Sequence, residues 1–363
     1  MVSRASCAQR AQVSRSEPKA SEDHQVSERS QDSQGREQRL STSGPGVVAI
    51  LGLRTFAGRE IALRLATGTP RLRVVGVDLR RPFGLDERVH FHTVDLTDLR
   101  AAATLAEVFE KERVEAVLHA AFRSDPTPDH ESDHELDTLG SLHVMHACAA
   151  AKVGRLVVLS STMLYGPHPD NPNYLSEAHP LRGHPGAHAV RDRIEVERLL
   201  DDWRERHPDV EVSVLRACWP IGPTFTNRVV RYFSLPVVPL PIGYDPLIQL
   251  VHEHDLLDAC ERALLASHPG VFNVVGRGVL PLSTLFRLAR QRTLPLPAAL
   301  LDRIAYLPSD AQSGDPPAAF FDYLRYLWVA DGQRGWDAFG EPAYSTQEAW
   351  ISFVSARRMR RYR

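Results

Sequence analysis

Short runs of aliphatic and β-branched residues alternate with longer helical patterns from residue 47 to about residue 275, and this alternation constrains the fold most strongly. The short runs are apolar throughout, as expected for strands that are covered on both faces. Parallel strands joined by right-handed helical crossovers account for both properties. The sequence therefore predicts an α/β protein with a doubly wound parallel sheet. The predicted strands are residues 47–51, 74–78, 89–94, 114–119, 156–159, 210–215 and 271–275.

Helical patterns lie between these strands at residues 59–65, 99–111, 142–152 and 195–206, and a further one approaches and follows residue 250, up to residue 265. After Arg216 the sequence becomes rich in proline and irregular, and late segments at 320–329 and 346–354 resemble amphipathic helices. We therefore expect a nucleotide-binding core at about 45–218 and 248–275. A smaller C-terminal lobe on the substrate side would comprise about 219–247 and 276–355.

The two ends of the chain have unusual compositions. Residues 1–44 contain few large apolar side chains and are predicted to be a disordered arm, because they cannot bury enough surface to offset the entropy of ordering. The arm is either regulatory or the product of a misassigned start codon. Residues 356–363 form a basic tail that is either a solvated end or a contact for an anionic surface.

The overall composition excludes several classes of protein. A formal net charge of −2 gives no general attraction to nucleic acid. The four cysteines, Cys7, Cys148, Cys218 and Cys260, have neither zinc-finger nor disulfide-framework spacing, so we expect no metal and a cytoplasmic location. The sequence contains neither an apolar run long enough to span a membrane nor a secretory signal pattern.

A glycine-containing turn follows the first predicted strand and opens the first helix. It contains Gly52, Thr55, Phe56 and Gly58. Glycines at such a turn let the backbone approach a pyrophosphate that rests on the helix N-terminus. As an alternative, a glycine at this place serves only as a turn or cap residue.

Asp78 ends the second strand about 20 residues after Gly58, where a carboxylate would bind the ribose hydroxyls of an adenosine. This position favours NAD as the cofactor. Arg80 and Arg81 could instead bind a 2′-phosphate, which leaves NADP open. An aspartate at a strand end is also a common turn residue.

From Val47 to about Val354 the chain resembles the extended short-chain dehydrogenase/reductases, especially their nucleotide-sugar epimerase/dehydratase branch. The resemblance implies a Rossmann fold with a bound dinucleotide. The stretches that carry it are residues 94–98 (VDLTD), 117–121 (VLHAA), 156–166 (LVVLSSTMLYG), 214–216 (VLR), 222–223 (GP), 251–255 (VHEHD) and 271–274 (VFNV).

The resemblance assigns roles to several residues. Asp95, with Leu96 after it, would lie near the adenine. His119, Ala120 and Ala121 would line the cofactor, and Ser161 would take the place of the family's catalytic Ser or Thr. Relatives often dimerise through a helix pair, so a homodimer is an expectation by analogy.

The chain departs from the family pattern at the proton donor. The family's catalytic Tyr is followed four residues later by a Lys, and these positions hold Ala189 and Arg193 here. Arg193 retains a positive charge that could bind the nicotinamide ribose. Ala189 has no titratable group, and losing a positioned acid or base typically lowers the rate by ~10²–10⁴.

Three further positions differ from the family. Thr55 replaces the middle glycine of the turn, Trp219 stands where an Asn is common, and Ile248 stands where the branch often has an Arg that binds the substrate diphosphate. Losing that arginine removes a charge-assisted contact, which makes a nucleoside-diphosphate sugar a weaker expectation.

Other residues could replace the missing proton donor or bind a metal. His184, His188 and Tyr165 are candidates for the proton donor, although each is more simply a loop or packing residue. The cluster at 252–255 (HEHD) suggests a metal site, but Asp255 is more simply a helix cap or packing partner.

Three functions remain open on the sequence. The first is an NAD(P)-dependent epimerase, dehydratase or reductase that acts on a sugar or other secondary alcohol, with Ser161 orienting the hydroxyl. The second is a catalytically silent dinucleotide-binding sensor or scaffold. The third is a dehydrogenase of an apolar alcohol such as a steroid or lipid, which Trp219 and Ile248 favour.

Overall fold

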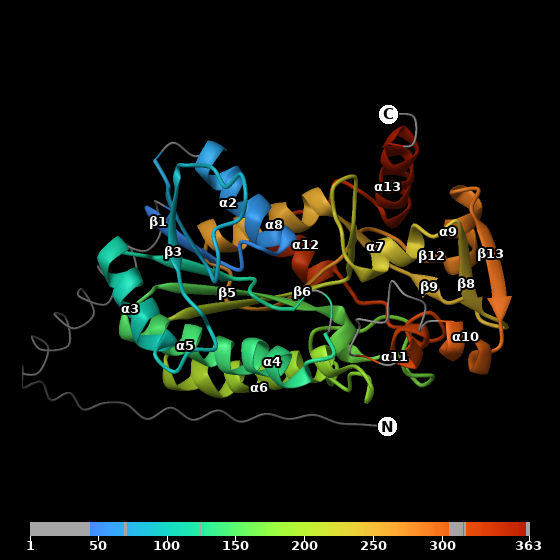
Figure 1. Ribbon diagram of the computed structural model, residues 1–363, viewed down its shortest axis with the longest axis horizontal. Coiled ribbons are helices and arrows are strands. Elements are labelled where there is room, and N and C mark those ends of the chain that lie inside the picture. The colour runs from blue at the N-terminus through green and yellow to red at the C-terminus, as the bar shows by residue number, and fades with distance from the viewer. Residues whose placement is uncertain are drawn as a thin grey trace, which may run out of the picture. The chain divides into compact units, whose positions relative to one another are not determined.

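A seven-stranded parallel sheet forms the centre of the computed structural model, which describes residues 44–68, 71–123, 125, 127–304, 315 and 317–360 (Figure 1). The strand order is β11-β6-β5-β4-β1-β2-β3, so the chain winds outward from β1 in both directions. This is the predicted doubly wound sheet. The strands are β1 (Val47–Leu51), β2 (Arg73–Asp78), β3 (Val89–Thr93), β4 (Ala116–His119), β5 (Arg155–Ser161), β6 (Glu211–Ala217) and β11 (Gly270–Val274).

Both faces of this sheet are covered by helices. The central strands are almost entirely buried, as their continuous apolar sequences require. In Figure 1, α2 and α8 lie on one face, and α3, α5 and α6 lie on the other. The helices of the core are α2 (Phe56–Gly68), α3 (Ala101–Glu112), α4 (His130–His134), the π-helical turn η2 (Glu135–Leu139), α5 (Gly140–Ala150), α6 (His188–Arg206) and α8 (Glu253–Leu265), with a 3₁₀ turn η3 (Thr162–Tyr165) after β5.

The rest of the chain forms a smaller lobe of short elements beside the carboxyl ends of the strands (Figure 1). Its strands pair in twos: β10 with β7, β12 with β9, and β13 with β8. Its elements are β7 (Trp219–Ile221), α7 (Arg228–Phe233), β8 (Val237–Pro241), β9 (Leu247–Ile248), β10 (Leu250–His252), β12 (Leu280–Pro281), α9 (Leu282–Leu288), β13 (Arg292–Leu296), α10 (Ala298–Ile304), α11 (Pro317–Asp322) and α13 (Thr346–Arg360). Helix α12 (Gln333–Phe339) packs instead on β11 and α8 of the core.

The predicted helix at 320–329 is wrong. Helix α11 ends at Asp322, and the chain then turns back on itself. The indole of Trp328 donates a hydrogen bond to the Tyr323 carbonyl (3.0 Å), and the Val329 carbonyl accepts one from the backbone of Leu175 (2.9 Å). The apolar residues of this segment are therefore buried by a folded turn rather than by one face of a helix.

The predicted helix at 346–354 is present as α13 and continues to Arg360. Most of the predicted basic tail therefore lies in the last turn of this helix, where Arg358 donates to the Ala289 carbonyl at 2.7 Å. Arg361 and Arg363 lie outside the described residues, as does the predicted arm except for Gly44. None of the helices in the described part of the chain combines the length and apolar character of a membrane span.

Candidate nucleotide-binding and catalytic site

The turn between β1 and α2 is built so closely that two of its residues must be glycine. Gly52 has a φ of +89°, and a Cβ there would lie 2.6 Å from the backbone of Ala121. A Cβ on Gly58 would lie 2.3 Å from the Gly52 carbonyl oxygen. The turn therefore packs directly against the end of β4, and its glycines serve that approach.

Thr55 fits this turn through its hydroxyl. The hydroxyl donates to the Gly52 carbonyl (2.8 Å) and accepts a hydrogen bond from the Gly58 backbone N–H (3.1 Å). Thr55 is not among the residues with positive φ, so its β-branched side chain causes no backbone strain. The side chain replaces the flexibility of a glycine with a local cap on the first turn of α2.

Asp78 lies at the end of β2 beside the same turn. Its carboxylate accepts hydrogen bonds from the backbone N–H groups of Arg54 (2.8 Å) and Leu79 (2.7 Å). Arg80 is exposed, and Arg81 lies over the ring of Phe91 at 5.9 Å. The carboxylate is thus fixed at the edge where the sequence predicted the ribose contact.

Asp95 and Leu96 occupy the next strand–helix connection. Asp95 accepts two hydrogen bonds from Thr97 in a tight turn, and the Leu96 carbonyl accepts one from His143 at 2.8 Å. His119 lies at the end of β4, where its Nε2 contacts the Ser141 hydroxyl at 2.9 Å. Burial lowers the pKa of His119 to about 3, and Arg193 adds to this effect, so the imidazole is neutral.

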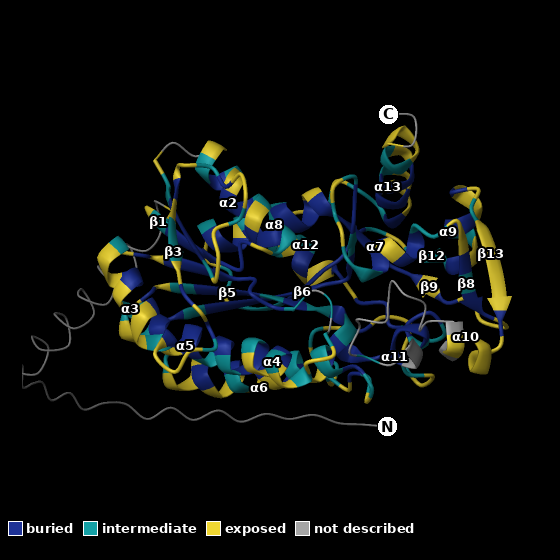
Figure 2. Ribbon diagram, in the orientation of Figure 1, coloured by how far each residue is buried: buried dark blue, intermediate teal, exposed yellow. Residues whose placement is uncertain are grey.

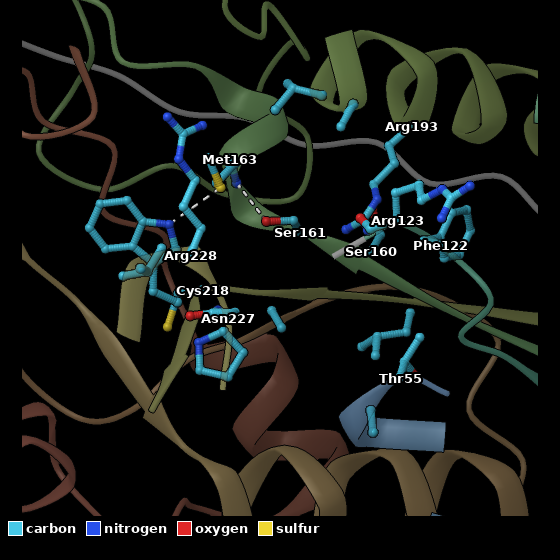
Figure 3. A pocket seen from close by; sticks show the side chains of 18 of the residues that line it. Thr55, Phe122, Arg123, Ser160, Ser161, Met163, Arg193, Cys218, Asn227 and Arg228 are labelled. Carbon is cyan, nitrogen blue, oxygen red and sulfur yellow. Dashed lines mark hydrogen bonds between the residues drawn. The ribbon is translucent and has the colours of Figure 1, made fainter. Parts of the chain in front are cut away.

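A single cavity of about 220 Å³ extends from the glycine turn across the end of β5 into the smaller lobe. Figure 3 shows Ser161 inside it, with Arg193 and Phe122 to one side, Arg228 to the other and Thr55 across from it. Of the predicted site residues, Thr55, Phe56, Ala120, Ser161 and Arg193 line the cavity. Gly52, Gly58, Asp78, Arg80, Asp95, Leu96, His119, Ala121 and Tyr165 are not among its lining residues.

Ala189 and Arg193, the positions that the resemblance assigns to the family's Tyr and Lys, line this cavity one helical turn apart on α6. Arg193 is half-buried, donates to the Arg123 carbonyl (3.0 Å) and stacks over the Phe122 ring at 4.9 Å. Ser161 faces the same space, and its hydroxyl accepts the Met163 backbone N–H at 3.2 Å. The wall therefore has a hydroxyl and a guanidinium but no phenol at position 189.

Tyr165 does not supply the missing phenol. It is completely buried outside the cavity lining, donates to Asn273 Oδ1 (2.7 Å) and accepts from Arg216 (3.0 Å). Burial raises its pKa. The catalytic assignment of Tyr165 is therefore corrected: the η3 turn directs its ring into the core.

The candidate histidines also lie elsewhere. His184 pairs with Asp322 at 3.0 Å, His188 stacks on His130 at 3.9 Å, and neither is among the lining residues. Tyr323, which the sequence analysis did not single out, does line the cavity. Its hydroxyl donates to the Met163 carbonyl at 2.8 Å, and burial together with Asp315 and Asp322 raises its pKa, which makes it a poor proton donor.

The half of the cavity in the smaller lobe is largely aromatic and aliphatic. Trp219 stacks on Phe320 (ring centroids 6.1 Å apart) and meets Trp328 edge to face (4.8 Å), and its indole N–H points to the Met163 sulfur at 3.3 Å. Ile248 is buried in the short sheet with β12 and does not line the cavity, so its expected influence on the substrate is corrected.

Arg228 is a cavity residue that the sequence analysis missed. Its guanidinium lies over the Phe320 ring at 5.2 Å and forms no ion pair within the described residues. The local signal was Asn227, whose side chain caps α7 and places Arg228 in its first turn.

Asp137 is a second missed residue, beside the cavity wall in the π-helical turn η2. It is 1% exposed, and its Oδ1 accepts the Arg123 N–H at 2.9 Å, while its Oδ2 has no hydrogen-bond partner among the described residues. Burial raises its pKa to about 7, although Arg193 nearby acts in the opposite direction. A π-helical turn at such a place is a common feature of functional sites.

A buried ion pair braces the strand that carries Ser161. Glu197 and Arg216 approach to 2.6 Å, and the Ser160 hydroxyl donates to Glu197 Oε1 at 2.5 Å. This network ties α6 to β5 and β6 immediately behind the cavity.

The cluster at 252–255 has structural roles. His252 caps α8, Glu253 accepts backbone hydrogen bonds from Thr224 and Phe225, and Asp255 accepts them from Ala343 and Tyr344. The helix cap is therefore His252, and Asp255 is a packing partner. Among the described residues, no group of three or more His, Cys, Asp and Glu side chains is arranged to hold a metal ion.

The winding of the sheet, the glycine turn and the serine at the end of β5 define the class of the extended short-chain dehydrogenase/reductases. The sequence model of the NAD dependent epimerase/dehydratase family matches residues 48–275, and the chain belongs to this family. The resemblance inferred from the sequence is thereby confirmed.

Three similar proteins illustrate the relationship. An uncharacterized protein of Mycobacterium tuberculosis is 30% identical over 321 residues, which cover 86% of this chain and 84% of that protein. UDP-glucose 4-epimerase of Thermotoga maritima, solved with UDP-glucose, has a TM-score of 0.67 and 17% identity over 86% of this chain and 99% of that one. UDP-glucose 4-epimerase of Thermus thermophilus, solved with NAD, has a TM-score of 0.66 and 21% identity with the same coverage.

Proposed function

We propose that this chain binds NAD, with the pyrophosphate at the turn between β1 and α2 and the adenosine ribose near Asp78. Two observations support this proposal. Gly52 packs closely against the end of β4, and the N-terminal residues of α2 and its cap, Thr55, Phe56 and Ala57, line the cavity. The N-terminus of a helix is a favourable place for a pyrophosphate. The carboxylate of Asp78 disfavours a 2′-phosphate and thus NADP. The Thermus epimerase, with the same fold, was solved with NAD.

The substrate we propose is a secondary alcohol or ketone on an apolar body that also carries one anionic group. The observation that carries this proposal is the lining beyond Ser161, where Met163, Trp219 and Phe320 form apolar walls around the guanidinium of Arg228. Asp315 lines the same cavity, and burial raises the pKa of its carboxyl while the charge of Arg228 acts in the opposite direction. A pocket that is mostly apolar with a few placed polar groups fixes both the affinity and the orientation of a ligand.

The residues of this chain orient the reactants rather than transfer the proton. Bound NAD supplies the hydride acceptor or donor. Ser161 would hydrogen-bond the substrate oxygen, and Arg193, stacked on Phe122, would hold the nicotinamide ribose. Since position 189 is alanine, the proton would be exchanged with water, and turnover would be slow.

Ala189 itself favours a second candidate function, a dinucleotide sensor without turnover. In that case the cavity binds NAD and a ligand, but no hydride transfer occurs. Nucleotide sugars are the third class to be compared, because both epimerase structures described above are enzymes of UDP-glucose.

The test is calorimetric titration of the purified full chain, first with NAD⁺, NADH, NADP⁺ and NADPH, and then of the NADH complex with three ligand classes. These are steroid ketones, the same ketones carrying a carboxylate or sulfate, and UDP-glucose. We expect NADH to bind and the anionic ketones to bind better than the neutral ones. Arg228→Gln should remove that preference, a loss of roughly 10–100-fold for a charge-assisted hydrogen bond.

Binding of NADPH in preference to NADH would contradict the role of Asp78. Binding of UDP-glucose alone would replace the apolar substrate with a nucleotide sugar. Hydride transfer is followed separately by NADH absorbance, so tight binding of an anionic ketone without turnover would establish the sensor.

A further inference from the structure

The two-stranded sheet β8–β13 presents one face to solvent at the far end of the smaller lobe. In its register Val237 pairs with Arg292 and Val238 with Thr293, so alternate residues point to opposite faces. Val238 is completely buried, whereas Val237 is 42% exposed and Leu294 is 45% exposed. Figure 2 shows β13 as exposed along most of its length.

Further exposed apolar side chains lie next to this strand pair along the chain. Leu288 ends α9 just before β13, Leu300 lies in α10 just after it, and the backbone N–H of Ile242 bonds to the Leu296 carbonyl at 3.0 Å. All three side chains are exposed, at 40%, 42% and 56% respectively. We call the exposed residues in and next to this strand pair, Val237, Ile242, Leu288, Leu294 and Leu300 with Arg287, Arg290 and Arg292, the docking face.

The charge of the docking face differs from that of the whole chain. Residues 232–244 and 286–300 contain no Asp or Glu, while the second segment contains Arg287, Arg290 and Arg292, and the chain as a whole has a net charge of −2. These three arginines form no ion pair within the described residues. Arg358, hydrogen-bonded to the Ala289 carbonyl at 2.7 Å, adds a fourth guanidinium at the border.

The exposed aliphatic side chains could insert into the apolar layer of a membrane, and the arginines without ion pairs could bind the anionic headgroups above it. A second copy of the chain would fit poorly. Pro239 and Pro295 remove backbone donors from the strand pair, and the arginines of two copies would repel each other. We propose that the docking face binds the surface of an anionic phospholipid bilayer. This proposal is independent of the proposed function.

The test is co-sedimentation of the full chain with vesicles of phosphatidylcholine, with or without phosphatidylglycerol. We expect binding to the anionic vesicles that weakens as salt is raised, and little binding to phosphatidylcholine alone. Arg290→Glu with Arg292→Glu should lower the partition coefficient by roughly 30-fold or more, since each arginine near a membrane surface contributes about a fivefold effect. Leu288→Ser with Leu294→Ser should weaken binding at every salt concentration.

The matched control is Arg198→Glu with Arg204→Glu. It makes the same change in net charge, but at exposed positions of α6, which covers the central sheet and lies outside the smaller lobe. It should retain vesicle binding. Absence of binding by the unaltered chain, or an equal loss in the control, would overturn the proposal. The proposal would also be overturned if light scattering without vesicles showed a dimer, the docking-face substitutions dissociated it, and the chain did not bind vesicles.

Discussion

The glycine turn and the wall formed by α6 both line one cavity, but they differ to different extents from the pattern that the resemblance predicts. At the turn, Thr55 replaces a glycine, and its hydroxyl takes over the bonds that hold the turn together. On the wall, Ala189 stands where the resemblance expects a tyrosine, and the phenol of Tyr323 and the carboxyl of Asp315 line the cavity at other positions.

The difference shows that binding and chemistry can separate within one fold. The turn depends on backbone geometry, which a well-placed hydroxyl can preserve. General acid–base catalysis depends on one titratable atom at one place, which packing alone cannot replace. We therefore expect the dinucleotide-binding half to be intact and the catalytic half to be weak.

Restoring the catalytic pair should produce the largest effect. Ala189→Tyr with Arg193→Lys places a phenol and an ammonium one turn apart in the cavity beside Ser161. We expect turnover to rise by ~10²–10⁴ over the parent chain, measured as NADH absorbance with the best ligand from the binding screen.

The matched control is Ala189→Phe with Arg193→Lys, which adds the same ring without the hydroxyl. It should bind NADH and remain as slow as the parent. If the tyrosine variant binds NADH and ligand yet gains no turnover, the wall differs from the family in more than its proton donor.

Closing the glycine turn should have the next largest effect. Gly52→Ala imposes a left-handed backbone on a residue with a Cβ and brings that Cβ against Ala121. The strain and overpacking together should cost about 2–5 kcal/mol of unfolding free energy and abolish NADH binding. Urea unfolding and fluorescence titration measure the two effects.

Gly68→Ala is the comparison, because a Cβ there meets no atom within 4 Å. It should preserve NADH binding. Unchanged NADH affinity in Gly52→Ala would show that the dinucleotide does not use this turn.

The sequence predicted the central sheet better than the smaller lobe, for physical reasons. The strands of the sheet are apolar on both faces, so their own residues reveal them. The short strands β8 and β13 acquire their structure from pairing across more than 50 positions, as between Val237 and Arg292, and no local pattern marks them. The misassignment of residues 320–329 as a helix has the same cause, because the end of this segment pairs with distant Leu175.

Within the site, Ala189 and Arg193 precede the predicted helix at 195–206, but α6 begins at His188, so their four-residue spacing puts both on the cavity wall. Spacing alone misplaced Tyr165, because the direction of a side chain after a 3₁₀ turn depends on distant Asn273 and Arg216. Asp137 was missed because its environment comes from three separate segments that carry Arg123, Arg193 and the π-helical turn.

Asp137 gives the stability of the folded protein a pH dependence. Its folded pKa is raised from the ordinary 3.8 to about 7, so between these values the folded state holds a proton that the unfolded state has released. Stability from this group is therefore complete below about pH 4 and decreases as the pH rises towards 7. Between pH 5 and pH 7 the free energy of unfolding of Asp137→Asn should therefore fall by about 2 kcal/mol less than that of the parent chain.

Urea unfolding at pH 5, 6 and 7 measures this slope. Asp202→Asn, an exposed substitution on α6, should leave the slope of the parent chain unchanged. A slope in Asp137→Asn that equals that of the parent would mean that the Asp137 carboxyl is ionised in the folded protein.

The smallest effect tests whether the Thr55 hydroxyl serves the turn or the ligand. Thr55→Ser keeps the hydroxyl and should match the parent in both stability and NADH affinity. Thr55→Val keeps the shape but leaves the Gly58 N–H without its acceptor, at a cost of ~1 kcal/mol of unfolding free energy. Because the hydroxyl proton is already donated to the Gly52 carbonyl, NADH affinity should change little. A loss of about tenfold or more in Thr55→Val, with Thr55→Ser unaffected, would instead show that the hydroxyl donates to the pyrophosphate. In that case the turn would have acquired a new ligand contact along with its cap, and the contrast with the α6 wall would be greater still.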